Sequence, residues 1–213
     1  MSPGRTYHLY THANGSENLF RSDENFRYFL KRYGEFVTDV ADTLAWCLMP
    51  NHLHLLVRIK NEAELVVFFK NKNLVKDLTG LLRDRHQDLS GLELELELER
   101  LVILQFSHLF NAYTKAFNKF YQRRGSLFVR AFRRKEITTD SYYTSIIQYI
   151  HRNPVHHGFT KQLTDWPWTS YHSYLHPHLT PFQQEVINWF GNREQFILLH
   201  QSAGETLTDL ADD

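Results

Sequence analysis

TLAWCLMPNHLHLLVRI, residues 43–59, consists of two apolar runs separated by a turn. Each run has the length and the apolar content of a buried strand. Pro50 and Asn51 stand between the runs, and both residue types favour turns. The stretch therefore predicts a β-hairpin whose second strand, at 52–59, begins directly after the turn.

The sequence on either side of the hairpin predicts alternating strands and helices. The expected elements are strands at 6–13 and 126–138 and helices at about 26–40, 62–90, 101–121 and 141–152. Asn14-Gly15 ends the first strand, and Pro154 marks the end of the last of these helices. The order β-α-β-β-α-β-α predicts an α+β fold of the ferredoxin-like type, also found in the RNA-recognition motif. In that fold an antiparallel sheet carries helices on one face.

Residues 1–175 are expected to form one domain, and residues 176–213 a small C-terminal helical extension with a frayed polar tail. Two short helices are expected in that extension, at 182–190 and 193–200. The segment 84–100 includes the alternation GLELELELER, whose period of two favours a strand although leucine and glutamate favour a helix. The sequence leaves this conflict open, and an acidic surface insertion is the preferred interpretation.

Composition limits the class of protein. The chain has 213 residues, of which 42% are hydrophobic, enough for the core of a domain of ordinary size. Cys47 is the single cysteine, which excludes an internal disulfide and fits a reducing compartment. The N-terminal segment lacks the apolar stretch of a signal peptide, and no run approaches the length of a membrane span. We therefore expect a soluble cytoplasmic protein without a membrane partner.

The formal net charge of zero conceals an uneven distribution. Residues 113–161 contain ten Lys and Arg against two acidic residues, whereas residues 162–213 contain one Arg against seven acidic residues. A local basic segment of this kind suits a phosphate backbone, although a solvated surface with charges offset in space is the alternative.

His52 and His54 are two residues apart in the second strand of the hairpin. Their side chains therefore point to one face of the sheet, with Cα atoms about 6.6 Å apart. We expect that face to be open, because Leu53 and Leu55 point the other way, toward the helices. Two imidazoles at this spacing can bind one metal ion, but a further ligand is needed. Half-buried histidines satisfied by their neighbours are the alternative.

The helix expected at 141–153 offers the missing groups. Tyr149 and Asn153 are four residues apart and so lie on one face of that helix. The amide oxygen of Asn153 can complete the ligand set, with Tyr149 one turn away. A tyrosine beside a metal on a basic surface indicates nucleophilic attack on a phosphodiester and a phosphotyrosine product. A packing role is the alternative for Tyr149.

Five motifs resemble, in their order, those of the single-tyrosine HUH transposases, a family named for its His-hydrophobe-His pair. They are YHLYTHANGSENLF (7–20), WCLMPNHLHLLV (46–57), GSLFVRAFRRKEI (125–137), YIHRNPVHHGF (149–159) and DWPWTSYHSYL (165–175). The resemblance covers about residues 6–175. The last two motifs look most like the REP-associated tyrosine transposases, which act on repetitive extragenic palindromes in bacterial genomes.

This resemblance implies an enzyme that cleaves and rejoins single-stranded DNA at hairpins through a 5′-phosphotyrosine intermediate. His52, His54 and Asn153 match the ligands of Mg²⁺ or Mn²⁺, and Tyr149 matches the nucleophile. The residues expected to contact DNA are Arg130, Arg133, Arg134, Lys135, Arg152 and His12. Relatives include monomers and homodimers, so self-association stays open.

The chain also departs from the family pattern. His12 stands where many relatives have an arginine, and His156-His157 follows NPV where Arg-Ala is common. We interpret the latter pair as exposed loop histidines. Trp166 and Trp168 can stack on bases, but core packing is the preferred interpretation. Tyr142 and Tyr143 share the helix of Tyr149 but lack a polar residue four positions on, which makes them poorer nucleophile candidates.

Two other functions fit the same residues. One is a domesticated DNA- or RNA-binding module that keeps the fold but no longer cleaves. The other is a hydrolase that uses the metal to activate water, although no obvious carboxylate base lies near the motifs.

Overall fold

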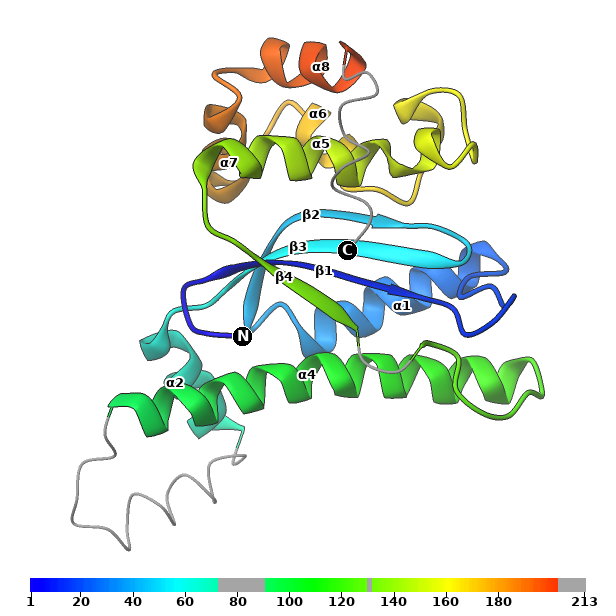
Figure 1. The fold of residues 1–213 in the computed structure, drawn as a ribbon, viewed down its shortest axis with the longest axis vertical. Coiled ribbons are helices and arrows are strands. Elements are labelled where there is room, and N and C mark those ends of the chain that lie inside the picture. The colour runs from blue at the N-terminus through cyan, green and yellow to red at the C-terminus, as the bar shows by residue number, and fades with distance from the viewer. Residues whose placement is uncertain (73–90, 130–131, 203–213) are drawn as a thin grey trace, which may run out of the picture. The chain divides into compact units, whose positions relative to one another are not determined.

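The computed structural model describes residues 1–72, 91–129 and 132–202. Its sheet contains β1 (Thr6–His12), β2 (Ala41–Leu48), β3 (His52–Ile59) and β4 (Arg133–Ile137), in the order β2-β3-β1-β4 (Figure 1). This is the order of a split βαβ arrangement, because β3 lies between β1 and the strand that follows the first helix. The predicted α+β fold with a four-stranded sheet is confirmed.

The register of β1 against β3 is antiparallel. The N–H of Ile59 donates to the carbonyl of Arg5 at 2.9 Å, and the N–H of Ala13 donates to that of Asn51 at 2.7 Å. This pairing sets His12 opposite His52 on one face of the sheet. The hairpin between β2 and β3 is closed by the N–H of Met49, which donates to the carbonyl of His52 at 2.9 Å.

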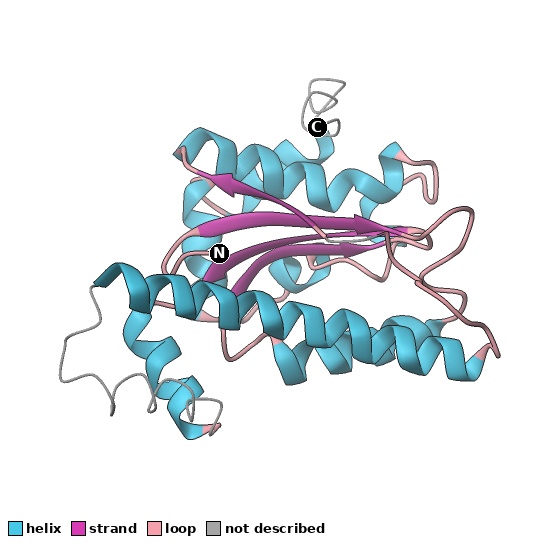
Figure 2. Cartoon of the chain, turned by 60° about the horizontal axis from the view of Figure 1, so that its bottom comes forward, coloured by secondary structure: helices cyan, strands magenta, loops and turns pink. Residues whose placement is uncertain are grey.

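The chain divides into two compact units. The first contains Met1–Tyr7, Arg27–Asp42 and Arg58–Gly125, and the second contains His8–Phe26, Thr43–Val57 and the chain from Ser126 onward. The helices within the described residues are α1 (Asp23–Phe36), α2 (Glu62–Asn71), α4 (Gly91–Phe120), α5 (Asp140–His156), α6 (Tyr171–Leu175), α7 (Pro181–Trp189) and α8 (Arg193–Ser202), with a short 3-10 helix, η1, at Leu163–Asp165. Helices account for more of the chain than strands do (Figure 2).

In the first unit, α4 is a single helix that starts ten residues before the predicted one. The acidic alternation at 91–100 forms the first third of this helix. The helix propensity of leucine and glutamate outweighs their alternation with a period of two. In a helix, leucines two positions apart point in different directions. Leu92 and Leu96 are therefore exposed, while Leu98 is buried. Residues 84–90 and the predicted frayed tail at 203–213 lie outside the described residues.

In the second unit, α5 lies over the strands and α8 lies beyond it (Figure 1). The prediction that Pro154 ends this helix was wrong, since α5 continues to His156. A proline removes one N–H donor, and the last turn is still closed by the N–H of His157, which donates to the carbonyl of Asn153 at 2.9 Å.

The predicted strand at 126–138 is shorter in the structure. Among its described residues, which exclude 130 and 131, Arg133–Ile137 forms a strand, and Phe128 makes an isolated antiparallel bridge with Ala13. Among the described helices, none has both the length and the apolar character that crossing a bilayer requires.

Candidate active site

The site begins as a cluster of rings on one face of β1 and β3. Alternation places His8, Tyr10 and His12 on the same face of β1, and the register brings this face beside His52 and His54. The ring of His8 stacks on that of His54 with centroids 5.2 Å apart, and the ring of His12 stacks on that of His52 at 4.9 Å. Four imidazoles thus lie side by side in the sheet.

This face is buried at His8, His52 and His54, contrary to the open face expected from the sequence, and is exposed at His12. His8, His52 and His54 are each less than 5% exposed. Burial lowers the pKa of His8 to about 3, with a smaller contribution from the charge of Lys135. Burial also holds the pKa of His54 well below its usual range, reinforced by the neighbouring histidines. Both imidazoles are therefore neutral near pH 7, and each retains a lone pair.

His8 supports His54 directly. His8 Nε2 and His54 Nδ1 are 3.0 Å apart, a hydrogen bond in which one ring donates and the other accepts. A histidine that binds a metal commonly has its other nitrogen held in this way, which fixes the orientation of the ring.

Asn51 supports His52 in the same manner. The turn places Asn51 Oδ1 2.7 Å from His52 Nδ1. An amide oxygen only accepts, so Nδ1 carries the proton and Nε2 carries the lone pair. His52 Nε2 is buried without a hydrogen-bond partner among the described residues. Burial lowers the pKa of His52 to about 3, aided by His157 and His12, so this lone pair is not protonated near pH 7.

Helix α5 covers the cluster with the two predicted residues. The ring of Tyr149 meets His54 edge to face, with centroids 5.4 Å apart, and meets His8 likewise at 6.1 Å. Asn153, one turn further on, is fully buried. Its Nδ2 donates to the backbone carbonyl of Tyr149 at 2.9 Å, which orients the amide and leaves Oδ1 without a hydrogen-bond partner among the described residues.

The unpartnered atoms of His52 and Asn153 belong to neighbouring groups. The Asn153 side chain acts to raise the pKa of His52, so the two interact, yet two lone pairs cannot hydrogen-bond to each other. Two buried lone pairs that share a site, here on a nitrogen and an oxygen, suit a cation. They belong to two of the residues that the sequence predicted as ligands of Mg²⁺ or Mn²⁺. In the described residues, no three His, Cys, Asp or Glu side chains form a metal-binding group. A metal here would therefore need the amide of Asn153.

The structure adds neighbours that sequence reasoning missed. His157 follows α5 and has an exposed side chain, but its ring meets that of His52 at 4.6 Å. The role of His8 was also missed, although its spacing of four from His12 already placed both on one strand face. The position of His157 had no comparable sequence signal, because it depends on where α5 ends.

The basic residues of β4 divide between its two faces. The charge of Lys135 lowers the pKa of His8, and the charge of Arg133 lowers that of His12, so these two side chains border the histidine cluster. Arg134 lies between them in the strand and points to the other face. Arg130 lies outside the described residues. The predicted phosphate contacts of Arg133 and Lys135 fit this placement.

Arg152 does not border the histidine cluster in the way that Arg133 and Lys135 do. A guanidinium N–H of Arg152 donates to the backbone carbonyl of His200, so this side chain is directed toward α8. The tryptophans also have packing contacts. Trp168 stacks on Phe26 at 4.6 Å, and Trp166 Nε1 donates to the backbone carbonyl of Leu48 at 3.0 Å.

A buried chain of hydrogen bonds attaches α5 to its neighbours. His151 Nε2 is 2.8 Å from Ser170 Oγ, and His151 Nδ1 is 2.9 Å from His200 Nε2. Ser170 Oγ accepts the N–H of Trp46 in β2 at 2.8 Å, and His200 Nδ1 donates to the carbonyl of Phe196 at 2.7 Å. This Ser170–His151–His200 chain connects β2, α5 and α8, and thereby holds the helix that carries Tyr149.

The strand order β2-β3-β1-β4 and the accompanying helices define an α+β protein with a split βαβ sheet. A solved structure described as a REP-associated tyrosine transposase bound to a REP hairpin has this fold, with a TM-score of 0.51, 18% identity and coverage of 85% of both chains. No protein-family model matches the chain.

Two curated proteins are similar in sequence. One, from Haemophilus influenzae and provisionally named a REP-associated tyrosine transposase, is 24% identical over 157 residues, which are 71% of this chain and 68% of that protein. The other, the REP-associated tyrosine transposase of Escherichia coli, is 37% identical over 65 residues, which are 30% of this chain and 33% of that protein. The chain is therefore similar to REP-associated tyrosine transposases, and the predicted resemblance to that family is confirmed.

Proposed function

We propose that the protein is a metal-dependent transposase that nicks and rejoins single-stranded DNA through a 5′-phosphotyrosine intermediate. The observation that carries this proposal is the arrangement on α5. Tyr149 meets His54 and His8 edge to face, while Asn153, one turn away, presents an unpartnered oxygen to the site of the unpartnered nitrogen of His52.

The protein's residues have separate roles in this proposal. His52, His54 and Asn153 would hold Mg²⁺ or Mn²⁺, which would neutralise charge on the reacting phosphate. Asn51 keeps His52 in the tautomer for binding, and His8 holds the ring of His54 in its orientation. Arg133 and Lys135, at the border of the cluster, would hold the DNA backbone.

The chemical step exchanges one phosphoester for another. The phenol oxygen of Tyr149 bonds to phosphorus, the bond between phosphorus and the 3′ oxygen breaks, and the phenol proton leaves as the 3′ oxygen gains one. The 5′ end is then linked to the protein, and a free 3′-hydroxyl can reverse the exchange. No bond energy is lost in this exchange, so strands can be rejoined without a nucleotide cofactor.

The proposed substrate is a DNA hairpin with adjoining single strand. The structural relative is described as bound to a REP hairpin, and this chain has the basic β4 residues Arg133 and Lys135 at the border of the histidine cluster. Neither observation specifies the base sequence of the hairpin.

A covalent adduct tests the proposal. Labelled hairpin oligonucleotide incubated with Mn²⁺ should give a protein–DNA band on a denaturing gel, and Tyr149→Phe should abolish it. Tyr143→Phe is the matched control, because Tyr143 lies on the same helix but packs against Trp189 at 5.0 Å. Chelation of the metal should remove the band. Binding without an adduct would favour the non-cleaving module, and cleavage without an adduct would favour the hydrolase.

A further inference from the structure

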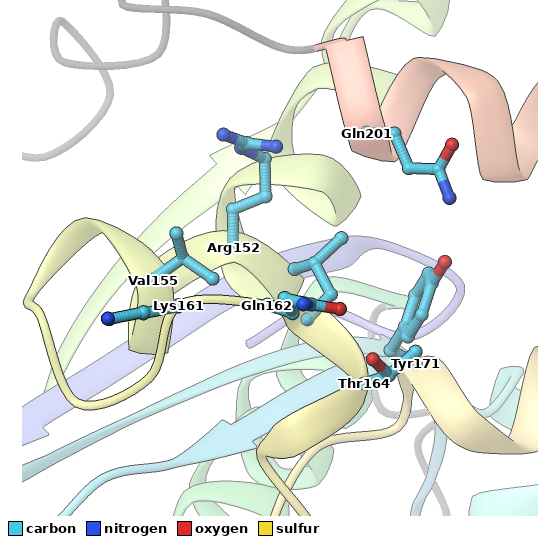
Figure 3. A pocket seen from close by; sticks show the side chains of 8 residues that line it. Arg152, Val155, Lys161, Gln162, Thr164, Tyr171 and Gln201 are labelled. Atoms are coloured by element: carbon cyan, nitrogen blue, oxygen red, sulfur yellow. The ribbon is translucent and has the colours of Figure 1, made fainter.

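A cavity lies beside α5, apart from the histidine cluster. Its volume is about 270 Å³, and its lining comes from α5, the segment 161–164, α6 and α8 (Figure 3). The lining residues are Arg152, Val155, Lys161, Gln162, Leu163, Thr164, Tyr171 and Gln201. Small-molecule sites usually measure about 300–1,000 Å³, so this cavity is close to the lower limit of that range and is far too small for a duplex.

The lining has the chemistry of an anion site. It contains a guanidinium and an ammonium but no carboxylate. Arg152 is held in place by its bond to the carbonyl of His200, and burial alone accounts for the lowering of its pKa, with no acidic neighbour contributing. A guanidinium remains a cation in proteins and has further N–H donors for a phosphate.

The rest of the lining is suited to a base. Leu163 and Tyr171 are buried and provide an apolar floor, whereas Gln162, Thr164 and Gln201 are exposed and polar. Figure 3 shows Arg152 and Lys161 toward one end of the cavity and Tyr171 and Gln201 toward the other. A cationic end and an amide-edged apolar end match the phosphate and the base of one nucleotide.

We propose that this cavity binds one unpaired nucleotide of the DNA strand, with its phosphate at Arg152 and Lys161 and its base at the Leu163–Tyr171 floor. The inference rests on the proposed function and names a second contact for the same substrate. Arg152 is three residues beyond Tyr149 on α5, about 4.5 Å along the helix axis. Along the helix axis, Arg152 is therefore less than one turn from Tyr149.

A salt titration of DNA binding tests whether Lys161 contacts a phosphate of the strand. In a Tyr149→Phe background, which prevents cleavage, anisotropy would be measured with two labelled hairpins, one blunt and one with a single-stranded extension. Lys161→Gln should reduce the slope of log Kd against log salt by about 0.7 for the extended hairpin, the value of one single-strand phosphate contact. The slope for the blunt hairpin should not change. Lys119→Gln, an exposed lysine of α4 outside the cavity, is the control and should change neither slope.

A second variant, at Gln162, tests whether the cavity binds the base of the nucleotide. Gln162→Ala removes an exposed amide without removing charge, so it should weaken binding of the extended hairpin severalfold while leaving the salt slope unchanged. The side chains of Lys161 and Gln162 are both exposed, so the thermal unfolding of each variant should match that of the parent protein.

Three outcomes would overturn the proposal. Lys161→Gln could leave the slope for extended DNA unchanged, or lower it equally for both hairpins. Lys161→Gln could also weaken the binding of a free deoxynucleoside monophosphate while leaving the binding of the extended hairpin unchanged. The cavity would then be a site for a free nucleotide. These are binding measurements, so they give an answer even if the wild-type protein forms no phosphotyrosine adduct.

Discussion

At the residue scale, the site depends on how each histidine is held. Asn51 assigns the proton of His52, His8 orients the ring of His54, and burial keeps both rings neutral. A neutral imidazole offers its lone pair to a metal, whereas a protonated one does not. Burial disfavours protonation of these histidines, and it thereby leaves each ring a lone pair that can bind a metal.

Asn51→Ala should weaken Mn²⁺ binding by about 10–100-fold, as loss of a second contact to a metal-binding histidine typically does. The reason is that His52 Nδ1 loses its acceptor, so the ring can turn and its tautomer is no longer set. Free Mn²⁺ measured by electron paramagnetic resonance would report the affinity. Asn18→Ala, at an exposed asparagine of the same unit, is the control. Equal affinity in Asn51→Ala and wild type would show that this bond does not tune the site.

At the element scale, α5 is positioned by contacts on both of its sides. Tyr149 and Asn153 face the histidine cluster, and His151 joins Ser170 and His200 on the other side. The position of the nucleophile candidate is thus coupled to α8, an element that contributes nothing to the histidine cluster itself.

The buried His200 should make stability sensitive to acid. Burial lowers its pKa to about 4 from 6.5, against the opposing effect of its bond to Phe196. Between these values the unfolded chain binds more protons, so the stability contributed above pH 6.5 is lost as the pH falls toward 4. His200→Gln keeps an acceptor toward His151 but cannot titrate. Its free energy of unfolding should therefore fall less on acidification, by about 1.4 kcal/mol per pH unit in that range.

Urea unfolding at pH 7, 6 and 5 would measure this difference. His176→Gln, at an exposed histidine, is the control and should follow the wild-type pH profile. A His200→Gln protein that loses stability with acid as steeply as wild type would contradict the assignment.

At the scale of the whole molecule, the C-terminal helices belong to the same compact unit as the site helix. Val186, Ile187 and Phe196 are buried in one apolar cluster with Ile147 and Ile150 of α5. The extension expected from the sequence is therefore part of the core that supports Tyr149.

Phe196→Ala should destabilise the protein by about 3–5 kcal/mol, because it removes a fully buried ring that packs against Tyr171 and His200. Leu198→Ala on the same helix is the matched control, since Leu198 is 54% exposed and its loss should change stability by less than about 0.5 kcal/mol. Chemical denaturation monitored by circular dichroism would compare the two. Similar losses in both variants would mean that α8 does not share the core.

Local pattern was enough to determine much of this protein. Apolar runs and turn residues predicted the β2–β3 hairpin, the period of two placed His52 and His54 on one face, and the period of 3.6 placed Tyr149 with Asn153. Each of these relations joins residues within a few positions of one another, so backbone geometry alone sets them.

Only the tertiary structure decided the rest, because the partners are distant in the chain. His8 meets His54 across 46 positions, and His151 meets His200 across 49. The burial of the histidine face, the approach of His157 to His52 and the unpartnered lone pairs of the site all depend on where α5 packs. Packing is a sum over contacts throughout the core, and no local spacing contains that information.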